Sequence, residues 1–306
     1  MTSHLSQAKA DSPQRKLEIS ARDNRQKQRQ KLRQHSFVGI CLGGGKTART
    51  SVAVVDYFPQ HKKVFLSRII DRVGSEGDNS ADRQLLKVIA DLDKRPEWIA
   101  LDVPLQLPKC LRCRLKCPGY ERCKVPEIQW LRRSHARYRA KKRPHKMFTP
   151  YTQRCVEQFI AHELEETFHP QHALGANSAP LTARAQYLLK HLKPATLEVI
   201  PEVALWRIGK ALGMSRLHLR HHRHSIEGEK SRHYILQNLV ANQVVFIYEQ
   251  DLQVLASNGC AFDAFIAAFT AYLNFVQKCE ARPKGYPRAA SWVAIPLRQW
   301  PSAKRK

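Results

Sequence analysis

FVGICLGGGKTARTSVAVVDYF, residues 37–58, is the stretch that decides the fold of this chain. It holds two apolar runs, at 37–42 and 50–58, on either side of a glycine-rich turn. A third run, KVFLSRIID at 63–71, follows after a short polar gap. Short runs rich in Val, Ile and Phe, separated by turn residues, are typical of strands. We therefore expect an antiparallel meander of three strands.

The rest of the chain alternates between helical and strand-like patterns. Ser80 precedes apolar residues that share one helical face between 85 and 92, and WIALDVPL at 98–105 predicts a strand closed by Pro104. TLEVI at 196–200 predicts a further strand. The remaining predicted elements are a short strand at 291–297 and helices at 152–168, 183–192, 203–212, 231–248 and 258–278. This order indicates an α/β fold with a mixed sheet flanked by helices.

Composition indicates a polyanionic partner. The 306 residues include 52 Lys or Arg and 26 Asp or Glu, for a net charge of +26. Phosphates displace counterions onto basic side chains, so nucleic acid, either DNA or RNA, is the first candidate and an anionic membrane surface the second. The chain has no apolar run of about 20 residues and no apolar stretch near its start. We expect a cytoplasmic protein that is not embedded in a membrane.

Charge and apolar content also divide the chain into segments. Residues 1–36 are polar and basic, and they predict a disordered tail that is either solvated or laid on phosphates. Residues 37–300 form the expected folded domain, interrupted at about 108–146 by an insertion of different character. Residues 301–306 form a short basic tail.

Four of the eight cysteines lie within this insertion, at Cys110, Cys113, Cys117 and Cys123. The other four are scattered in apolar or helical surroundings, which is unlike a short disulfide scaffold and favours a reducing compartment. Four thiolates in a small loop predict a structural metal knuckle. Zn²⁺ is the first candidate and a [4Fe–4S] cluster the alternative, since the spacing matches neither usual pattern.

The insertion is also strongly basic. Residues 109–146 contain 14 Lys or Arg and 2 acids, a local net charge of +12. Ordinary exposed helices mix charges of both signs, so this segment predicts a nucleic-acid contact surface. Trp130 and Tyr138 could stack on unpaired bases. The predicted contacts are Arg132, Arg133, Arg137, Arg139, Lys141, Lys142 and Arg143. A second basic segment, the His-rich 218–224, is expected to be a loop facing nucleic acid.

Three acids stand beside apolar elements: Asp102 at a strand end, Glu198 within a strand and Asp263 in a nearly all-apolar helix. A carboxylate in such surroundings is costly unless it is paired or binds a cation. Cleavage of phosphodiesters by two metal ions needs several carboxylates that converge on Mg²⁺ or Mn²⁺. We expect these three residues to form a catalytic site.

Four segments carry a resemblance to a known family, in this order: VGICLGGGKTARTSVAVVD, ALDVPLQLP, LEVIPEVAL and CAFDAFIAAFTAYL. Through them the chain resembles the domain-of-unknown-function family 429 (DUF429), predicted RNase H-like nucleases. The resemblance runs from about residue 37 to 297. It implies an RNase H-like fold and a metal-dependent nuclease activity. It also implies an acidic metal site to which Asp102, Glu198 and Asp263 correspond.

One position departs from the family pattern. The resemblance implies an Asp as central metal ligand in the first strand, where this chain has Cys41. A thiolate is a soft ligand that suits Mg²⁺ poorly. The alternative function is therefore a catalytically inactive nucleic-acid-binding protein on an RNase H-like fold. Asp56 on the next strand is a candidate substitute. A third interpretation, a small-anion enzyme using the turn at 43–45, is disfavoured because the spacing is not that of a P-loop and a strand follows.

Overall fold

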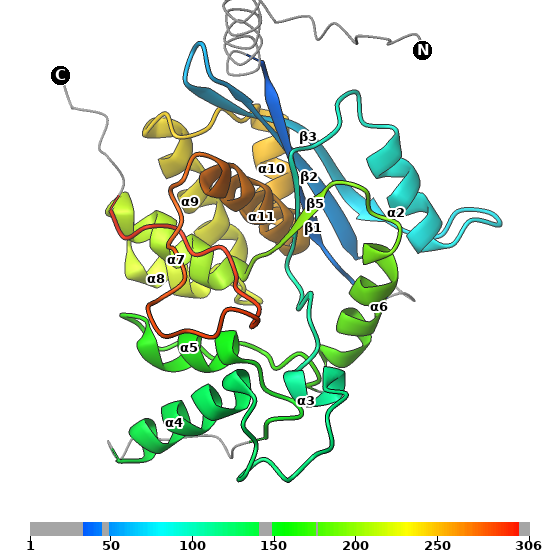
Figure 1. Ribbon diagram of the computed structural model, residues 1–306. Coiled ribbons are helices and arrows are strands. Elements are labelled where there is room, and N and C mark those ends of the chain that lie inside the picture. Colours follow the sequence, from blue (N-terminus) through cyan, green and yellow to red (C-terminus); the bar gives the residue numbers. More distant parts are fainter. Residues whose placement is uncertain (1–32, 45–48, 141–148, 176, 300–306) are drawn as a thin grey trace, which may run out of the picture.

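The computed structural model describes residues 33–44, 49–140, 149–175 and 177–299, and it shows a mixed α/β fold (Figure 1). The predicted tail at 301–306 and most of the predicted tail at 1–36 lie outside these ranges. The sheet has five strands in the order β3-β2-β1-β4-β5. They are β1 (His35–Cys41), β2 (Thr50–Phe58), β3 (Lys63–Val73), β4 (Trp98–Leu101) and β5 (Ala195–Glu198).

The predicted meander is confirmed. Strand β2 pairs antiparallel with both β1 and β3, whereas β4 runs parallel to β1 and β5 runs parallel to β4. The carboxyl ends of β1, β4 and β5 therefore meet at one edge of the sheet, which is where open α/β sheets commonly place their ligands. In the register, Ile40 lies beside Leu101, and Leu101 lies beside Glu198.

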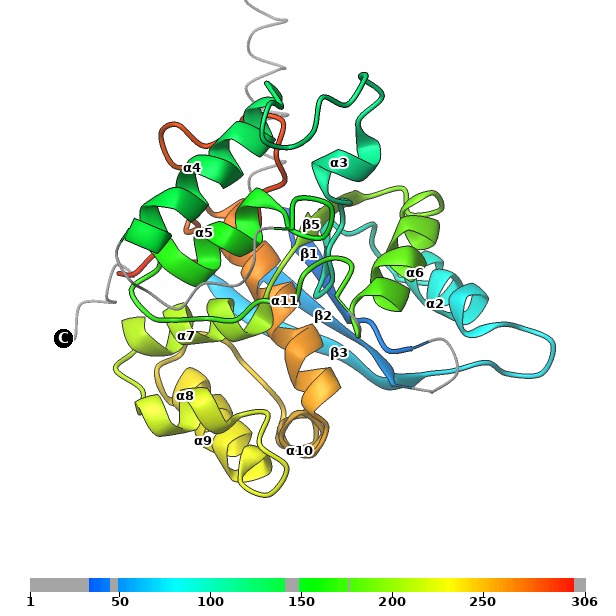
Figure 2. The same cartoon turned by 90° about the horizontal axis from the view of Figure 1, so that it is seen from below.

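Helix α11 (Gly259–Phe275) packs across one face of the sheet, against β1 and β2 (Figure 2). Its apolar surface is buried on nearly every side, as its sequence predicts. The approach to β1 is very close. A Cβ atom on Gly39 would lie 2.0 Å from the carbonyl oxygen of Ala264 and 2.4 Å from the backbone nitrogen of Ala268. Glycine on the strand and alanine on the helix let the two backbones touch.

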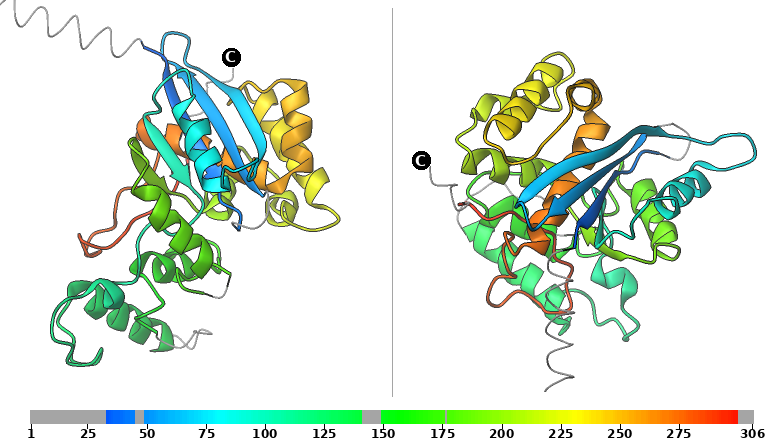
Figure 3. Two further views of the ribbon diagram at one scale, coloured as in Figure 1. Left: turned by 90° about the vertical axis from the view of Figure 1, so that its right-hand side faces the viewer. Right: turned by 90° about the horizontal axis from the view of Figure 1, so that it is seen from above.

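Helices α2 (Ala81–Ala90) and α6 (Ala179–Leu189) cover the other face (Figure 3). They form a smaller core with the strand residues that point away from α11. The predicted start of the first helix is confirmed, because Ser80 is its N-cap and its hydroxyl accepts a hydrogen bond from the backbone N–H of Arg83 at 3.3 Å.

The other helices lie around α11 and beyond the edge where β4 and β5 end (Figure 1). They are α3 (Lys109–Arg112), α4 (Pro126–Ala140), α5 (Cys155–Glu163), α7 (Pro201–Ala211), α8 (Arg216–His221), α9 (Gly228–Ala241) and α10 (Glu249–Ser257). The single helix predicted at 231–248 is wrong. Helix α9 ends at Ala241, and Gln243 then takes a φ of 55°, which interrupts the helical path.

Two further predictions are corrected. The segment 291–297 makes no strand, because its pairing is limited to a bridge between Cys279 and Pro296. The predicted loop at 218–224 begins as helix α8, and its arginines face acids. Arg220 lies 3.1 Å from Glu166, and His222 is buried with its Nδ1 2.8 Å from a backbone carbonyl. The prediction of a loop is therefore wrong for the part that forms α8, and the predicted role of the segment toward nucleic acid stays a prediction.

Within the described ranges, no single helix is both long enough and apolar enough to cross a bilayer. Helices α10 and α11 meet those criteria only when taken together, and the chain bends by 115° between them.

Candidate functional site

Three side chains from separate elements meet at the edge where β1 and β4 end. Cys41 is the last residue of β1, Asp102 directly follows β4, and Asp263 lies in the second turn of α11. One ligand atom from each lies within 4.8 Å of the other two. The parallel pairing of β1 with β4 brings the first two together, and the close packing of α11 on Gly39 brings the third.

Asp102 is held by the backbone of β1. Its Oδ1 accepts a hydrogen bond from the N–H of Leu42 at 2.9 Å, and its own N–H donates to the carbonyl of Ile40 at 3.2 Å. Burial raises the pKa of Asp102 to about 7, against the opposing effect of the Leu42 N–H; the charge of Asp263 raises it further and Arg223 lowers it. The metal-free site therefore disfavours the ionised form of this carboxyl.

Asp263 is only partly satisfied. Its Oδ2 accepts two hydrogen bonds from Arg223, at 2.7 and 3.1 Å. Its Oδ1 is buried and has no hydrogen-bond partner among the residues that the structure describes, and the residue as a whole is 7% exposed. A buried carboxylate oxygen without a partner costs free energy that a bound cation would recover.

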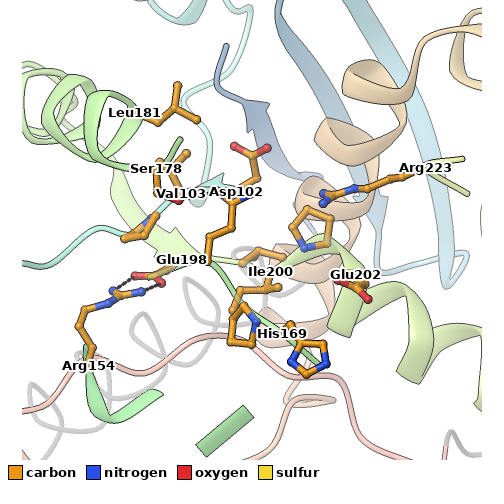
Figure 4. A pocket seen from close by; sticks show the side chains of 15 residues that line it. Asp102, Val103, Arg154, His169, Ser178, Leu181, Glu198, Ile200, Glu202 and Arg223 are labelled. Carbon is orange, nitrogen blue, oxygen red and sulfur yellow. Dashed lines mark hydrogen bonds and ion pairs between the residues drawn. The ribbon is translucent and has the colours of Figure 1, made fainter. Parts of the chain in front are cut away.

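Glu198 lies close by but belongs to a different network. Its two carboxylate oxygens accept hydrogen bonds from Arg154 at 2.7 and 2.8 Å, and one also accepts from the N–H of Leu105 at 2.9 Å. Figure 4 shows this carboxylate directed toward Arg154 and away from that of Asp102. Glu198 is not a member of the group formed by Cys41, Asp102 and Asp263. Its predicted role as a metal ligand stays a prediction.

Arg154 was not predicted from the sequence as a residue of the site. It lies just before α5 and also donates to Glu157 at 2.8 Å, so one buried guanidinium holds two buried carboxylates. The partner Glu198 is 44 residues away along the chain. A local pattern cannot reveal a pair at this separation.

A pocket of about 270 Å³ opens beside the site (Figure 4). Both acidic and basic side chains line its walls, which suits a substrate that carries both phosphate oxygens and a bound cation. The charged or titratable residues that line it are Asp102, Arg154, His169, Glu198, Glu202 and Arg223.

Cys41 forms a disulfide with Cys260, with a Cα–Cα distance of 5.5 Å. This bond, which joins two cysteines 219 residues apart, was not predicted from the sequence. The pairing arises because the end of β1 lies against the first turn of α11. Six other cysteines, the four of the insertion among them, are free.

Asp56 does not take the place of the missing Asp. It pairs with Ser36 near the start of β1, whereas Cys41 pairs with Ser51. Five strand residues separate the two positions on β2, a distance of about 17 Å at the usual rise per residue.

The residues present fit a divalent ion in part. Two carboxylates are ligands that Mg²⁺ and Mn²⁺ accept, and among the described residues Oδ1 of Asp263 has no hydrogen-bond partner. The third donor, the sulfur of Cys41, is one that softer ions prefer.

Of the four cysteines of the insertion, Cys110 lies in the short helix α3, Cys113 is its C-cap, and Cys117 and Cys123 follow it. Burial raises the pKa of the Cys110 thiol, and the thiols of Cys123, Cys117 and Cys113 raise it further, so the four lie within electrostatic range. In the described part of the chain, however, their sulfur atoms are not gathered within 4.8 Å of one another. The metal knuckle stays a prediction.

The basic side chains on α4 are less exposed than the sequence predicts. Arg133 is exposed, but Arg137 pairs with Glu163 at 3.2 Å, and Arg132 donates to the carbonyl of Cys123 at 3.4 Å. The side chain of Arg139, together with Lys141, Lys142 and Arg143, lies outside the described residues.

The aromatic residues of α4 face the protein. Tyr138 is 2% exposed and stacks on His162, so the expectation that it stacks on bases is wrong. Trp130 is partly buried and packs edge-on against Tyr286, with 5.3 Å between the ring centroids. The amphipathic helix uses its aromatic side for packing.

Fold and site together define a mixed α/β protein with a candidate metal centre at the carboxyl edge of its sheet. The chain belongs to the family described as "Protein of unknown function (DUF429)", whose model matches residues 44–285. This confirms the family predicted from sequence. The match begins after Cys41, so it does not bear on that position. No curated protein and no solved structure matched the chain.

Proposed function

We propose that this chain is an RNase H-like, metal-dependent nuclease that cleaves phosphodiester bonds in DNA or RNA. The observation that carries the proposal is the convergence of Asp102 and Asp263, from β4 and α11, beside a charged pocket. The sheet order supports the RNase H-like assignment, since an antiparallel meander continues into two parallel strands.

Within this proposal, Asp102 and Asp263 would hold Mg²⁺ or Mn²⁺. Such an ion would polarise the phosphate and stabilise the leaving oxygen. Arg223 borders both the pocket and Asp263, and its half-exposed side chain is placed to bind a phosphate oxygen of the substrate. Glu198 would be a third ligand of the metal ion. It would bind the ion through lone pairs of its carboxylate oxygens that do not accept hydrogen bonds from Arg154.

The partner class follows from charge. A net charge of +26 favours a polyanion, and exposed Arg133 together with the basic residues that follow α4 would supply contacts to the phosphates. Zn²⁺, or a [4Fe–4S] cluster, bound by Cys110, Cys113, Cys117 and Cys123 would hold this insertion in place. A cytoplasmic location would keep these thiols reduced.

The test is a cleavage assay on reduced protein, with DNA and RNA, in Mg²⁺ and in Mn²⁺. Asp102→Asn and Asp263→Asn should each abolish cleavage, whereas Asp78→Asn, which changes an exposed carboxylate remote from the pocket, should retain it. Full activity in Asp102→Asn combined with Asp263→Asn would overturn the proposed mechanism.

A second function is favoured by one observation. Cys41 occupies the position of the expected Asp and is tied to Cys260. A nucleic-acid-binding protein without catalytic activity on the same fold would tolerate this change. Salt-sensitive binding without cleavage in the wild type, together with cleavage gained in Cys41→Asp, would favour this second function.

A further inference from the structure

We infer that Cys41, Asp102 and Asp263 form a binding site for a divalent ion that accepts a thiolate ligand, such as Zn²⁺. The Cys41–Cys260 disulfide prevents binding of this ion, because it removes the thiolate. The inference deepens the proposed function, because it names the ion of the same centre and a chemical condition for its binding. It rests on Cys41 as a ligand, whereas the nuclease proposal rests on the two carboxylates.

The geometry of the three donors suits one ion. Zn²⁺ binds sulfur at about 2.3 Å and oxygen at about 2.0 to 2.2 Å, so its ligand atoms lie about 3 to 4 Å apart. The sulfur of Cys41 and one oxygen each from Asp102 and Asp263 lie within 4.8 Å of one another. Small side-chain rotations would bring them to one ion, and the fourth position would face the adjacent pocket.

The buried oxygen of Asp263 is an independent sign of a missing partner. Oδ2 of this residue accepts hydrogen bonds from Arg223, while Oδ1 is buried and makes no hydrogen bond to any described residue. In Asp102, by contrast, Oδ1 accepts from the Leu42 N–H. A cation bound by the carboxylate of Asp263 would supply the partner that Oδ1 lacks within the described ranges.

The charges of the group match a divalent ion. A thiolate at Cys41 and carboxylates at Asp102 and Asp263 contribute −3, and the guanidinium of Arg223, which is bound to Asp263, contributes +1. The sum is −2. A bound M²⁺ neutralises it, which matters because buried charge without compensation is unfavourable.

The sulfur of Cys41 can bind the ion only when the Cys41–Cys260 disulfide is reduced. In the disulfide, Cys41 carries no negative charge, and its sulfur is bonded to that of Cys260. Exchange with a low-molecular-weight disulfide converts the two protein thiols into this bond and releases two small thiols, so electrons and protons balance. The reverse reaction frees the thiolate of Cys41.

Cys260 also has an alternative partner when reduced. Its sulfur lies 2.7 Å from the carbonyl oxygen of Arg49, which can accept a hydrogen bond from the thiol. Cys260 is half-buried at the first turn of α11, beside an opening lined by Arg49 and Asn258, so a small disulfide can reach it. Cys260 is therefore the residue that switches the site, and it is not one of the ligands.

The experiment measures metal bound per chain by equilibrium dialysis, together with the thiolate-to-metal absorption of bound Co²⁺. Reduced wild type, Cys260→Ser, and Cys260→Ser combined with Cys41→Ser are compared. Cys279→Ser is the matched control, because it removes one free thiol elsewhere. All variants keep the four cysteines of the insertion, so any metal bound there cancels in the comparison.

Cys260→Ser and Cys279→Ser should bind as many ions as the reduced wild type. Adding Cys41→Ser to Cys260→Ser should remove one ion per chain and its share of the Co²⁺ absorption. Loss of a second-sphere partner costs 10- to 100-fold in affinity, so loss of this direct ligand should cost at least about 100-fold. Oxidised glutathione should remove the same ion from wild type and leave Cys260→Ser loaded.

Equal metal content with and without Cys41 would overturn the inference, as would loss of the ion from Cys260→Ser on oxidation. If Cys41→Ser fails to fold, Cys41→Asp in the Cys260→Ser background gives the same answer: the Co²⁺–thiolate absorption should fall and Mg²⁺ affinity should rise. These readouts do not measure cleavage. A protein that binds the ion through Cys41 but cleaves neither DNA nor RNA would therefore refute the proposed nuclease activity and leave the inference about the ion standing.

Discussion

The guanidinium of Arg154 holds both carboxylate oxygens of Glu198, at 2.7 and 2.8 Å, with both side chains almost fully buried. This pair joins the start of α5 to the end of β5 and forms one wall of the pocket. Because Arg154 also holds Glu157, one cation organises two acids in the protein interior.

Breaking this pair should destabilise the protein strongly. Glu198→Gln leaves the buried charge of Arg154 partly uncompensated, and such losses cost about 3–5 kcal/mol. Urea denaturation of Glu198→Gln, Arg154→Met and the double variant measures this coupling. We expect the double variant to lose less stability than the sum of the two single variants. Strict additivity would show that the pair is not coupled.

The close contact between Gly39 and α11 predicts the effect of a single methyl group. Gly39→Ala would place a Cβ atom 2.0 Å from the carbonyl oxygen of Ala264, so the helix must shift or the chain unfold. We expect a loss of at least about 1–3 kcal/mol in the free energy of unfolding. Gly44→Ala is the control, since apart from its chain neighbours no described residue has a heavy atom within 4 Å of its Cβ position. Equal thermal stability of the two variants would contradict this packing.

Asp102 predicts a pH dependence of stability in the metal-free protein. Its pKa is raised from 3.8 to about 7, so the folded state keeps a proton that the unfolded state releases between these values. The contribution of this carboxyl to stability is therefore present at low pH and is lost as the pH rises through 7. Asp102→Asn should be more stable than wild type at pH 8, and the difference should vanish near pH 4. Urea denaturation with a chelator tests this, and a less stable variant at pH 8 would contradict it.

Arg223 should have opposite effects on folding and on cation binding. Arg223→Gln removes the partner of the buried Asp263 and should cost about 1–3 kcal/mol in the metal-free protein. The same change lowers the net charge of the group formed by Cys41, Asp102, Asp263 and residue 223 from −2 to −3, so a divalent ion should bind more tightly. Denaturation and equilibrium dialysis on one preparation measure both. Weaker binding of the ion would show that Arg223 positions the ligands.

Arg133 tests the predicted nucleic-acid surface. It is exposed on α4, next to Arg132, which is partly buried and donates to a backbone carbonyl. If Arg133 contacts a phosphate, Arg133→Gln should reduce the slope of log K against log salt by about 1 and weaken binding similarly for all sequences. Lys87→Gln on α2 is a control from an exposed position on the face of the sheet that lies away from α11. An unchanged slope for Arg133→Gln would remove this residue from the interface.

Local patterns predicted much of the scaffold. The three-stranded meander, the strand before Asp102 and the helix capped by Ser80 all depend on residues within a few positions of one another. The proximity of Asp102 to Asp263 was expected from their places beside apolar elements, and the structure brings them together. The same patterns failed where a helix ended without a strong signal, as at Ala241.

The sequence by itself determined the α/β character, the five strands of the sheet, the family and the basic charge, because apolar periodicity and composition are local properties of the chain. Only the tertiary structure decided that Glu198 pairs with Arg154, that Tyr138 is buried and that Cys41 meets Cys260 and two carboxylates. Arg154 and Glu198 are 44 positions apart along the chain, and Cys41 and Cys260 are 219 apart. These relationships arise from which strand ends share an edge and how closely α11 approaches β1, and neither is encoded in any short stretch of residues.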